Sequence, residues 1–309
     1  MRLDLIAFFT ATLIALQARA NGELSKLIGN PIQAATISFS SGLIIIAIFA
    51  VTHQGMKQGL AGIRAAVREE KLPRWNLFAG MLGGTFVAIQ TNTVPLIGVA
   101  IYSVASIAGQ TASSLIVDAY GLSGGKKQHI TLRRVLAAFI TVGAVLVSVW
   151  DRIQADDLSL VPVLLAGFAG GIVGIQRALN GKINIYSGQH WATSLLNFIM
   201  GTSFLLIITA IMIPVGRYEF KPLPTSPAWI YIGGAIGVIY IAYSASIVQQ
   251  LGVLASTLLS VGGNLFGALL IDLIAPIHGK GVSIWLVSGI CLSFIGVIVG
   301  GVSSRQQKR

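Results

Sequence analysis

Two pairs of amide side chains in this sequence have the spacing of neighbours on one face of a helix. Gln17 and Asn21 form the first pair, and Gln176 and Asn180 form the second. Residues four apart in a helix lie one above the other, so both amides of each pair point the same way. An amide both donates and accepts hydrogen bonds, and each pair could therefore bind a polar solute that carries no net charge.

Further amides lie inside long apolar runs, where a polar side chain is costly and needs a partner. One hypothesis is that these amides line a cavity and bind substrate. The other is that they bond one helix to the next, at well under about 2 kcal/mol for each bond. The full set of candidate substrate-binding residues is Gln17, Asn21, Gln90, Gln110, Gln176, Asn180, Asn197 and Asn264.

Four charged residues also lie within or beside apolar runs. Asp118 and Asp272 could couple transport to protons, or could act as a gate or as a helix-end contact to a nearby Lys or Arg. Arg19 and Arg177 flank the repeated amides. Each could attract an anionic solute, or could extend along the helix until its charge reaches water.

The sequence predicts neither a metal site nor a cofactor. Cys291 is the single cysteine, and the four histidines are scattered with no pair at the i, i+4 spacing of a helical metal site. None of the glycines follows a strand and opens a helix as a phosphate-binding loop does. We therefore predict no catalytic residues, and we expect a protein that is not an enzyme.

The composition indicates which solvent surrounds these residues. Of the 309 residues, 54% are hydrophobic and 10% are charged, and the mean hydropathy is +0.81. Such a chain has too few polar side chains to cover a soluble globule, so lipid must be its main solvent. The net charge of +11 does not indicate a nucleic-acid partner, because the basic residues lie between apolar runs and form no stripe with aromatic residues.

The apolar runs are continuous over about 20 residues, which is typical of membrane helices and not of barrel strands. The predicted fold class is all-α integral membrane, with about ten transmembrane helices in two inverted five-helix repeats. The first repeat covers residues 1–152 and the second covers residues 153–309. The predicted helices are 3–19, 31–53, 74–92, 96–119 and 132–150, then 160–179, 190–214, 228–248, 252–274 and 282–301. The first run could also be a cleavable signal peptide, but it has a counterpart inside the chain, so we expect it to be retained as a helix.

Matching residues recur between the halves. Gln17, Asn21 and Gly22 recur 159 residues later, and Trp75, Gly80 and Gly83 recur 154 residues later. Since each half has five predicted spans, the second half must enter the membrane from the opposite side. Placing both termini in the cytoplasm puts 15 of the 21 Lys and Arg residues inside, as the positive-inside rule expects.

A set of short motifs in a fixed order resembles the YdcZ-like family of the drug/metabolite transporter superfamily. The motifs are Q-x-x-x-N-G-x-L from Gln17, S-F-x-x-G from Ser38, Trp75 followed by glycines, P-L-I-G from Pro95, Gly109-Gln110, and D-x-x-G from Asp118. The resemblance implies a multi-pass protein of the bacterial inner membrane with a cavity between inverted halves. The second half departs from this pattern, since Gln249-Gln250-Leu251-Gly252 replaces the proline motif and Asn264 replaces glutamine.

These observations predict a secondary transporter that exports a small metabolite or amphiphile by alternating access. Its expected partners are a small-molecule substrate and membrane lipid, with the chain working as a monomer or a homodimer. A lipid flippase or scramblase would use the same architecture. An intramembrane aspartyl protease is a more distant alternative that would need Asp118 and Asp272 within hydrogen-bonding distance, and a channel has no filter-like loop in its favour.

Overall fold

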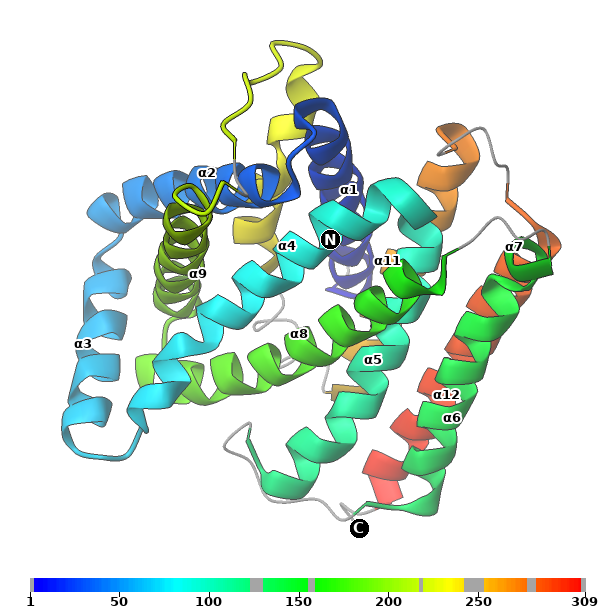
Figure 1. Ribbon diagram of the computed structural model, residues 1–309. Helices are drawn as coiled ribbons and strands as arrows, with labels where there is room; N and C mark the ends of the chain where they lie inside the picture. Colours follow the sequence, from blue (N-terminus) through cyan, green and yellow to red (C-terminus); the bar gives the residue numbers. More distant parts are fainter. Residues whose placement is uncertain are drawn as a thin grey trace.

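The computed structural model describes residues 3–122, 130–154, 159–216, 219–241, 253–276 and 282–306, and every regular element among them is helical (Figure 1). Residues 233–241 are also helical. The α-helices are α1 (Leu3–Ile28), α2 (Pro31–Thr52), α3 (Gln54–Arg68), α4 (Ala79–Ile97), α5 (Val99–Tyr120), α6 (Leu132–Ser148), α7 (Trp150–Gln154), α8 (Leu160–Ser187), α9 (His190–Met212), α11 (Val253–Ile274) and α12 (Ile284–Gln306), and short 3-10 helices are η1 (Arg74–Phe78) and η2 (Ala228–Tyr231).

Two helices extend well beyond their predicted ends. Helix α1 continues to Ile28 instead of ending near residue 19, and α8 continues to Ser187 instead of ending near residue 179. Hydropathy marks where a helix leaves the lipid, whereas the helix itself ends at a backbone signal. For both helices that signal is a glycine with positive φ, Gly29 at 71° and Gly188 at 58°.

Helix α3 lies in a segment where no helix was predicted. Its 15 residues could reach only about 22 Å, which is too short to cross a bilayer. The helix is amphipathic instead. It buries Met56, Gly59, Ile63 and Ala66 and packs on α8 and α9, while its lysine and arginines lie on the other side. An amphipathic helix of this length contains no long apolar run, and therefore hydropathy did not predict it.

The outer surface of the described helices is apolar, as lipid contact requires. Large hydrophobic side chains such as Ile48, Phe139, Leu164 and Ile211 are more than half exposed. Among the described residues, α2, α8, α9 and most of α5 are long and apolar enough to span a membrane, and α11 and α12 contain shorter apolar stretches. The protein is therefore a multi-pass membrane protein, while the count of ten spans stays a prediction.

Helices of one half pack against helices of the other half, and the two repeats use equivalent helices in these pairs. Helix α1 packs on α11 as α5 packs on α8, and α6 lies alongside α12 at one side of the molecule (Figure 1). Helix α2 packs on α9, where the rings of Phe39 and Phe198 stand 5.3 Å apart. These two phenylalanines are also separated by 159 residues, so equivalent residues meet each other at this contact.

The same reciprocal pairing is found at contacts between individual residues. A side chain at Gly80 would overlap the carbonyl oxygen of Asn197, and a side chain at Gly234 would overlap that of Ser38. Gly80 and Gly234 are equivalent in the two halves, and so are Ser38 and Asn197. In each half, therefore, a glycine at the same repeat position lets its helix approach the backbone of the other half closely, which a larger residue would prevent.

The contact between α5 and α8 is equally close and leads to a stability prediction. A Cβ at Gly109 would overlap the backbone of Gly167, so we expect Gly109→Ala to force the helices apart and lower the free energy of unfolding by about 1–3 kcal/mol. Gly143→Ala is the control, because a Cβ there meets no atom within 4 Å. Thermal unfolding of both variants in detergent is the measurement, and equal stability would contradict the close approach.

Candidate functional site

The amides of the second half form one hydrogen-bonded cluster between α8 and α9. The Asn197 Oδ1 atom accepts from Gln176 Nε2 at 3.0 Å and from Asn180 Nδ2 at 3.2 Å. In return, Asn197 Nδ2 donates to Asn180 Oδ1 at 2.7 Å and to the carbonyl oxygen of Thr193 at 3.0 Å. The i, i+4 pair of α8 thus converges on a single asparagine, which is the centre of the cluster.

The amides of the first half are bonded more simply. The Asn21 Nδ2 atom on α1 donates to Gln90 Oε1 on α4 at 3.1 Å, while Asn21 Oδ1 has no partner among the described residues. Gln17 lies one turn earlier, beside Gly237, and its equivalent Gln176 lies beside Gly83. The two glycines are equivalent as well, so each half provides the space that the other half's glutamine fills.

The remaining two amides lie on α5 and α11. Gln110 donates to Ser106 on its own helix at 3.3 Å, and Ser103 donates to Asn264 across the α5–α11 contact at 3.5 Å. The eight predicted residues therefore do not form a single ring. They comprise one cluster of three, one pair formed by Asn21 and Gln90, and three separate amides.

Burial divides the same eight amides into two classes. Four are inside the protein, with 0% of Asn21, 1% of Gln90, 1% of Asn197 and 6% of Gln176 exposed. The other four, which are half-buried, are Gln17, Gln110, Asn180 and Asn264. The buried class bonds helices together in this conformation, whereas the side chains of the half-buried class are partly exposed.

Asp272 of α11 caps the N-terminus of α5. Its Oδ1 accepts from the amide of Val99 at 3.2 Å and its Oδ2 accepts from that of Ala100 at 2.8 Å. The preceding residue, Gly98, has φ of 89° and turns the chain between α4 and α5. A carboxylate at this place satisfies two backbone donors and complements the helix dipole. The contact joins α11 of the second half to the backbone of the first half, whereas the sequence suggested a Lys or Arg as the partner.

The side chain of Asp118 lies outside the described residues, but its place in the chain is clear. It stands 18 residues after Ala100 in the same helix, which corresponds to about 27 Å at about 1.5 Å per residue. Because the Asp272 carboxylate is bonded to the start of that helix, the two acids cannot share a proton. This geometry does not fit the aspartyl protease alternative.

No group of metal-ligating side chains occurs among the described residues.

The two arginines beside the amides have different surroundings. Arg177 donates to the Tyr240 hydroxyl at 2.6 Å and its guanidinium lies 5.6 Å from the centre of that ring. Arg19 is paired with Glu23 at 3.7 Å. Tyr240 and Thr193 were not among the predicted residues. Thr193 precedes Asn197 by one helical turn, a spacing that could have identified it.

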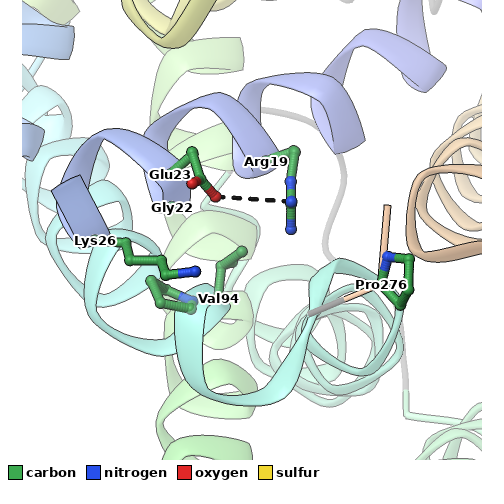
Figure 2. A pocket seen from close by; sticks show the side chains of 7 residues that line it. Arg19, Gly22, Glu23, Lys26, Val94 and Pro276 are labelled. Atoms are coloured by element: carbon green, nitrogen blue, oxygen red, sulfur yellow. Dashed lines mark ion pairs between the residues drawn. The ribbon is translucent and has the colours of Figure 1, made fainter. Parts of the chain in front are cut away.

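Two cavities lie away from the eight amides. A cavity of about 80 Å³ is lined by Arg19, Gly22, Glu23, Lys26, Val94, Pro95 and Pro276 (Figure 2). A wider groove of about 350 Å³ is lined by Pro31, Ile32, Thr85, Ala88, Ile89, Asn92, Leu165, Phe204 and Ile208. The first is rich in charge, and the second is mainly apolar with one exposed amide, that of Asn92.

Comparison with known proteins identifies one family. The sequence profile of the family described as "Putative inner membrane exporter, YdcZ" matches residues 3–147 and again residues 161–299. The two matches together cover most of the chain and coincide with its two halves. No curated protein matches the chain.

Proposed function

Because the chain belongs to the YdcZ family of inner-membrane exporters, as two tandem repeats, we propose that it is a secondary transporter that exports a small metabolite or amphiphile by alternating access. The observation that carries this proposal is the exchange of equivalent contacts between the halves, in which Gly80 meets Asn197 and Gly234 meets Ser38. Such reciprocal packing is expected of inverted repeats that surround a transport path.

The proposed topology has ten spans, five in each repeat, with both termini in the cytoplasm. Five spans per repeat make the second copy enter from the opposite side, and the reciprocal pairing of α1 with α11 and of α5 with α8 supports that arrangement. Two conformations that differ by exchanging the roles of the repeats would then open the same path to either side of the membrane.

Asp272 is the proposed gate residue of this cycle. Its carboxylate joins α11 of the second repeat to the start of α5 in the first repeat. Any motion that separates these helices must first replace two charge-assisted hydrogen bonds, so the contact favours the closed arrangement at this end. Asp118, its equivalent in the first repeat, is the candidate for the corresponding role at the other end.

The half-buried amides are the proposed solute contacts. Gln17 and Asn180 come from opposite repeats, as do Gln110 and Asn264, so a solute between the halves could reach donors and acceptors of both. Amides without fixed charge suit a neutral or zwitterionic polar group. We assign the fully buried amides to helix packing.

A lipid flippase or scramblase is the second candidate function, and the apolar groove favours it. The groove is bounded by α2, α4, α8 and α9, and its volume of about 350 Å³ suits part of a hydrocarbon chain. Its one exposed amide, Asn92, could meet a polar group attached to that chain.

Transport by proteoliposomes tests the two candidates together. We expect flux of at least one solute from a metabolite panel to depend on a pH gradient and to be lost in Gln17→Ala plus Asn180→Ala. Thr52→Ala, which alters an exposed hydroxyl bonded within α2, is the matched control and should keep full flux. If the protein instead scrambles lipid without any solute flux, and Asn92→Ala abolishes that scrambling, the solute carrier is rejected in favour of the lipid transporter.

A further inference from the structure

The smaller cavity is built on one face of the last two turns of α1. Arg19, Gly22, Glu23 and Lys26 follow the spacing i, i+3, i+4 and i+7, so their side chains point toward the same side. Figure 2 shows Arg19, Glu23 and Lys26 leaving α1 together, with Val94 of α4 and Pro276 across from them. The absence of a side chain at Gly22 lets α1 approach Val94 closely, since a Cβ there would lie 2.7 Å from a methyl group.

The charges in this cavity do not balance. Arg19 and Lys26 provide two positive charges and Glu23 provides one negative charge. The Arg19–Glu23 pair is long, at 3.7 Å, and Lys26 makes no ion pair within the described part of the chain. Asp272, one turn before Pro276, is bonded to the N-terminus of α5, whose dipole offsets its charge. Among the described residues, one positive charge is therefore left without an ion-pair partner, that of the exposed Lys26.

The position of Arg19 argues against a side chain that only extends into water. Its side chain is 16% exposed, whereas an arginine that places its charge outside the membrane would be mostly exposed. The opposite wall, formed by Val94, Pro95 and Pro276, offers the guanidinium no side-chain acceptor. An arginine held in such a place has donors available for a bound group.

The second repeat has a different charge pattern on the equivalent helix face. The residues equivalent to Arg19, Glu23 and Lys26 are Ala178, Lys182 and Ile185, although α8 matches α1 in its length and in its amide pair. The repeat fold therefore does not require an arginine, a carboxylate and a lysine together on this face of the helix. That combination occurs at the first repeat's face and not at the equivalent face of α8.

We propose that this cavity is a binding site for a small oxyanion, either a carboxylate or a phosphate group. A guanidinium recognises such a group with two parallel hydrogen bonds, and an ammonium adds a flexible point charge. The volume of about 80 Å³ holds roughly five water-sized groups, which is enough for one oxyanion and a water. The oxyanion displaces Glu23 as the partner of Arg19 and receives Lys26 as its second cation.

The oxyanion could be a soluble ion or the phosphate of a lipid headgroup, since both present the same chemistry. The binding experiment therefore has two arms, both with the full-length protein. In the first, thermal unfolding in uncharged detergent is followed against inorganic phosphate at constant ionic strength. In the second, the same unfolding is followed in nanodiscs of phosphatidylcholine, with and without phosphatidylglycerol.

We expect the midpoint of thermal unfolding to rise saturably with phosphate or with phosphatidylglycerol. The arm in which it rises identifies the source of the oxyanion. Lys26→Gln and the charge-neutral pair Arg19→Gln plus Glu23→Gln should remove the stabilisation, whereas Lys57→Gln on α3 should retain it. Glu23→Gln alone should tighten binding about two- to fivefold, because it removes the competing carboxylate. That gain would not follow from a purely structural role of the arginine.

Equal stabilisation of all variants, or none in either arm, would overturn the proposal. Binding is measured here without transport, so its result does not depend on whether the solute carrier or the lipid transporter is correct.

Discussion

Asp272→Ala is expected to open the end of the protein at which α4 turns into α5. The substitution removes the acceptors of the Val99 and Ala100 amides, which lie in the buried core. Each unsatisfied donor costs about 1–3 kcal/mol, so we expect the free energy of unfolding to fall by about 2–5 kcal/mol. The loss should be visible as a lower midpoint of thermal unfolding in detergent.

Opening of this end can be measured separately from stability. Ile97 is buried, with 1% exposed, and it immediately precedes the turn at Gly98. In a Cys291→Ala background, Ile97→Cys should resist a membrane-impermeant maleimide and should react once Asp272→Ala is added. The native cysteine must be removed first, because it is exposed.

Asp272→Asn is the matched control, since it keeps the shape of the side chain and one acceptor oxygen. We expect it to be intermediate in stability and largely protected from the maleimide. If Asp272→Ala lowers the stability but leaves Ile97→Cys protected from the maleimide, the carboxylate has no gate role and its contacts only complete the α5 helix.

Asn197→Leu should have the second largest effect. Leucine has a similar size, but it leaves Gln176, Asn180 and the Thr193 carbonyl oxygen without the bonds they make to this residue. Hydrogen bonds between membrane helices are worth about 0.6–1.7 kcal/mol each. The loss of the cluster should therefore lower the free energy of unfolding by about 2–5 kcal/mol and separate α8 from α9.

Thr202→Val is the control on the same helix. Thr202 is also buried, with 4% exposed, but its hydroxyl has no hydrogen-bond partner among the described residues. Removing that hydroxyl should leave stability unchanged or slightly raised. A small effect of Asn197→Leu, similar to that of Thr202→Val, would show that the amide cluster contributes little to packing and would shift its interpretation toward solute binding.

Local periodicity explains which parts of the site were predictable. Gln176 and Asn180 had to share a face of any helix that contained them, and they do converge on one partner. The identity of that partner was not predictable, because Asn197 lies on the next helix and its rotation about the helix axis is set by packing. The same holds for Asn21, whose partner Gln90 is 69 residues away.

The ends of the helices were likewise predictable from the sequence only in part. Apolar length predicted where α2 begins and ends to within a residue or so, since its apolar run stops at the caps, Asn30 and His53. It did not predict the end of α1, because the helix continues through the charged residues Arg19, Glu23 and Lys26 to Ile28. Hydropathy measures transfer between solvents, and a helix can continue after its solvent has changed.

By itself, the sequence determined the membrane class, the two repeats and the family. These follow from composition, from apolar length and from residues that recur at fixed offsets, all of which are properties of the chain before it folds. Only the tertiary structure decided that Asp272 bonds the backbone of α5, that four amides are buried while four stay accessible, and that Arg19 and Lys26 face Val94 and Pro276. The physical reason is that each of these contacts joins helices far apart in the sequence, and hydrophobic periodicity determines which face of a helix is polar but not which neighbour that face will meet.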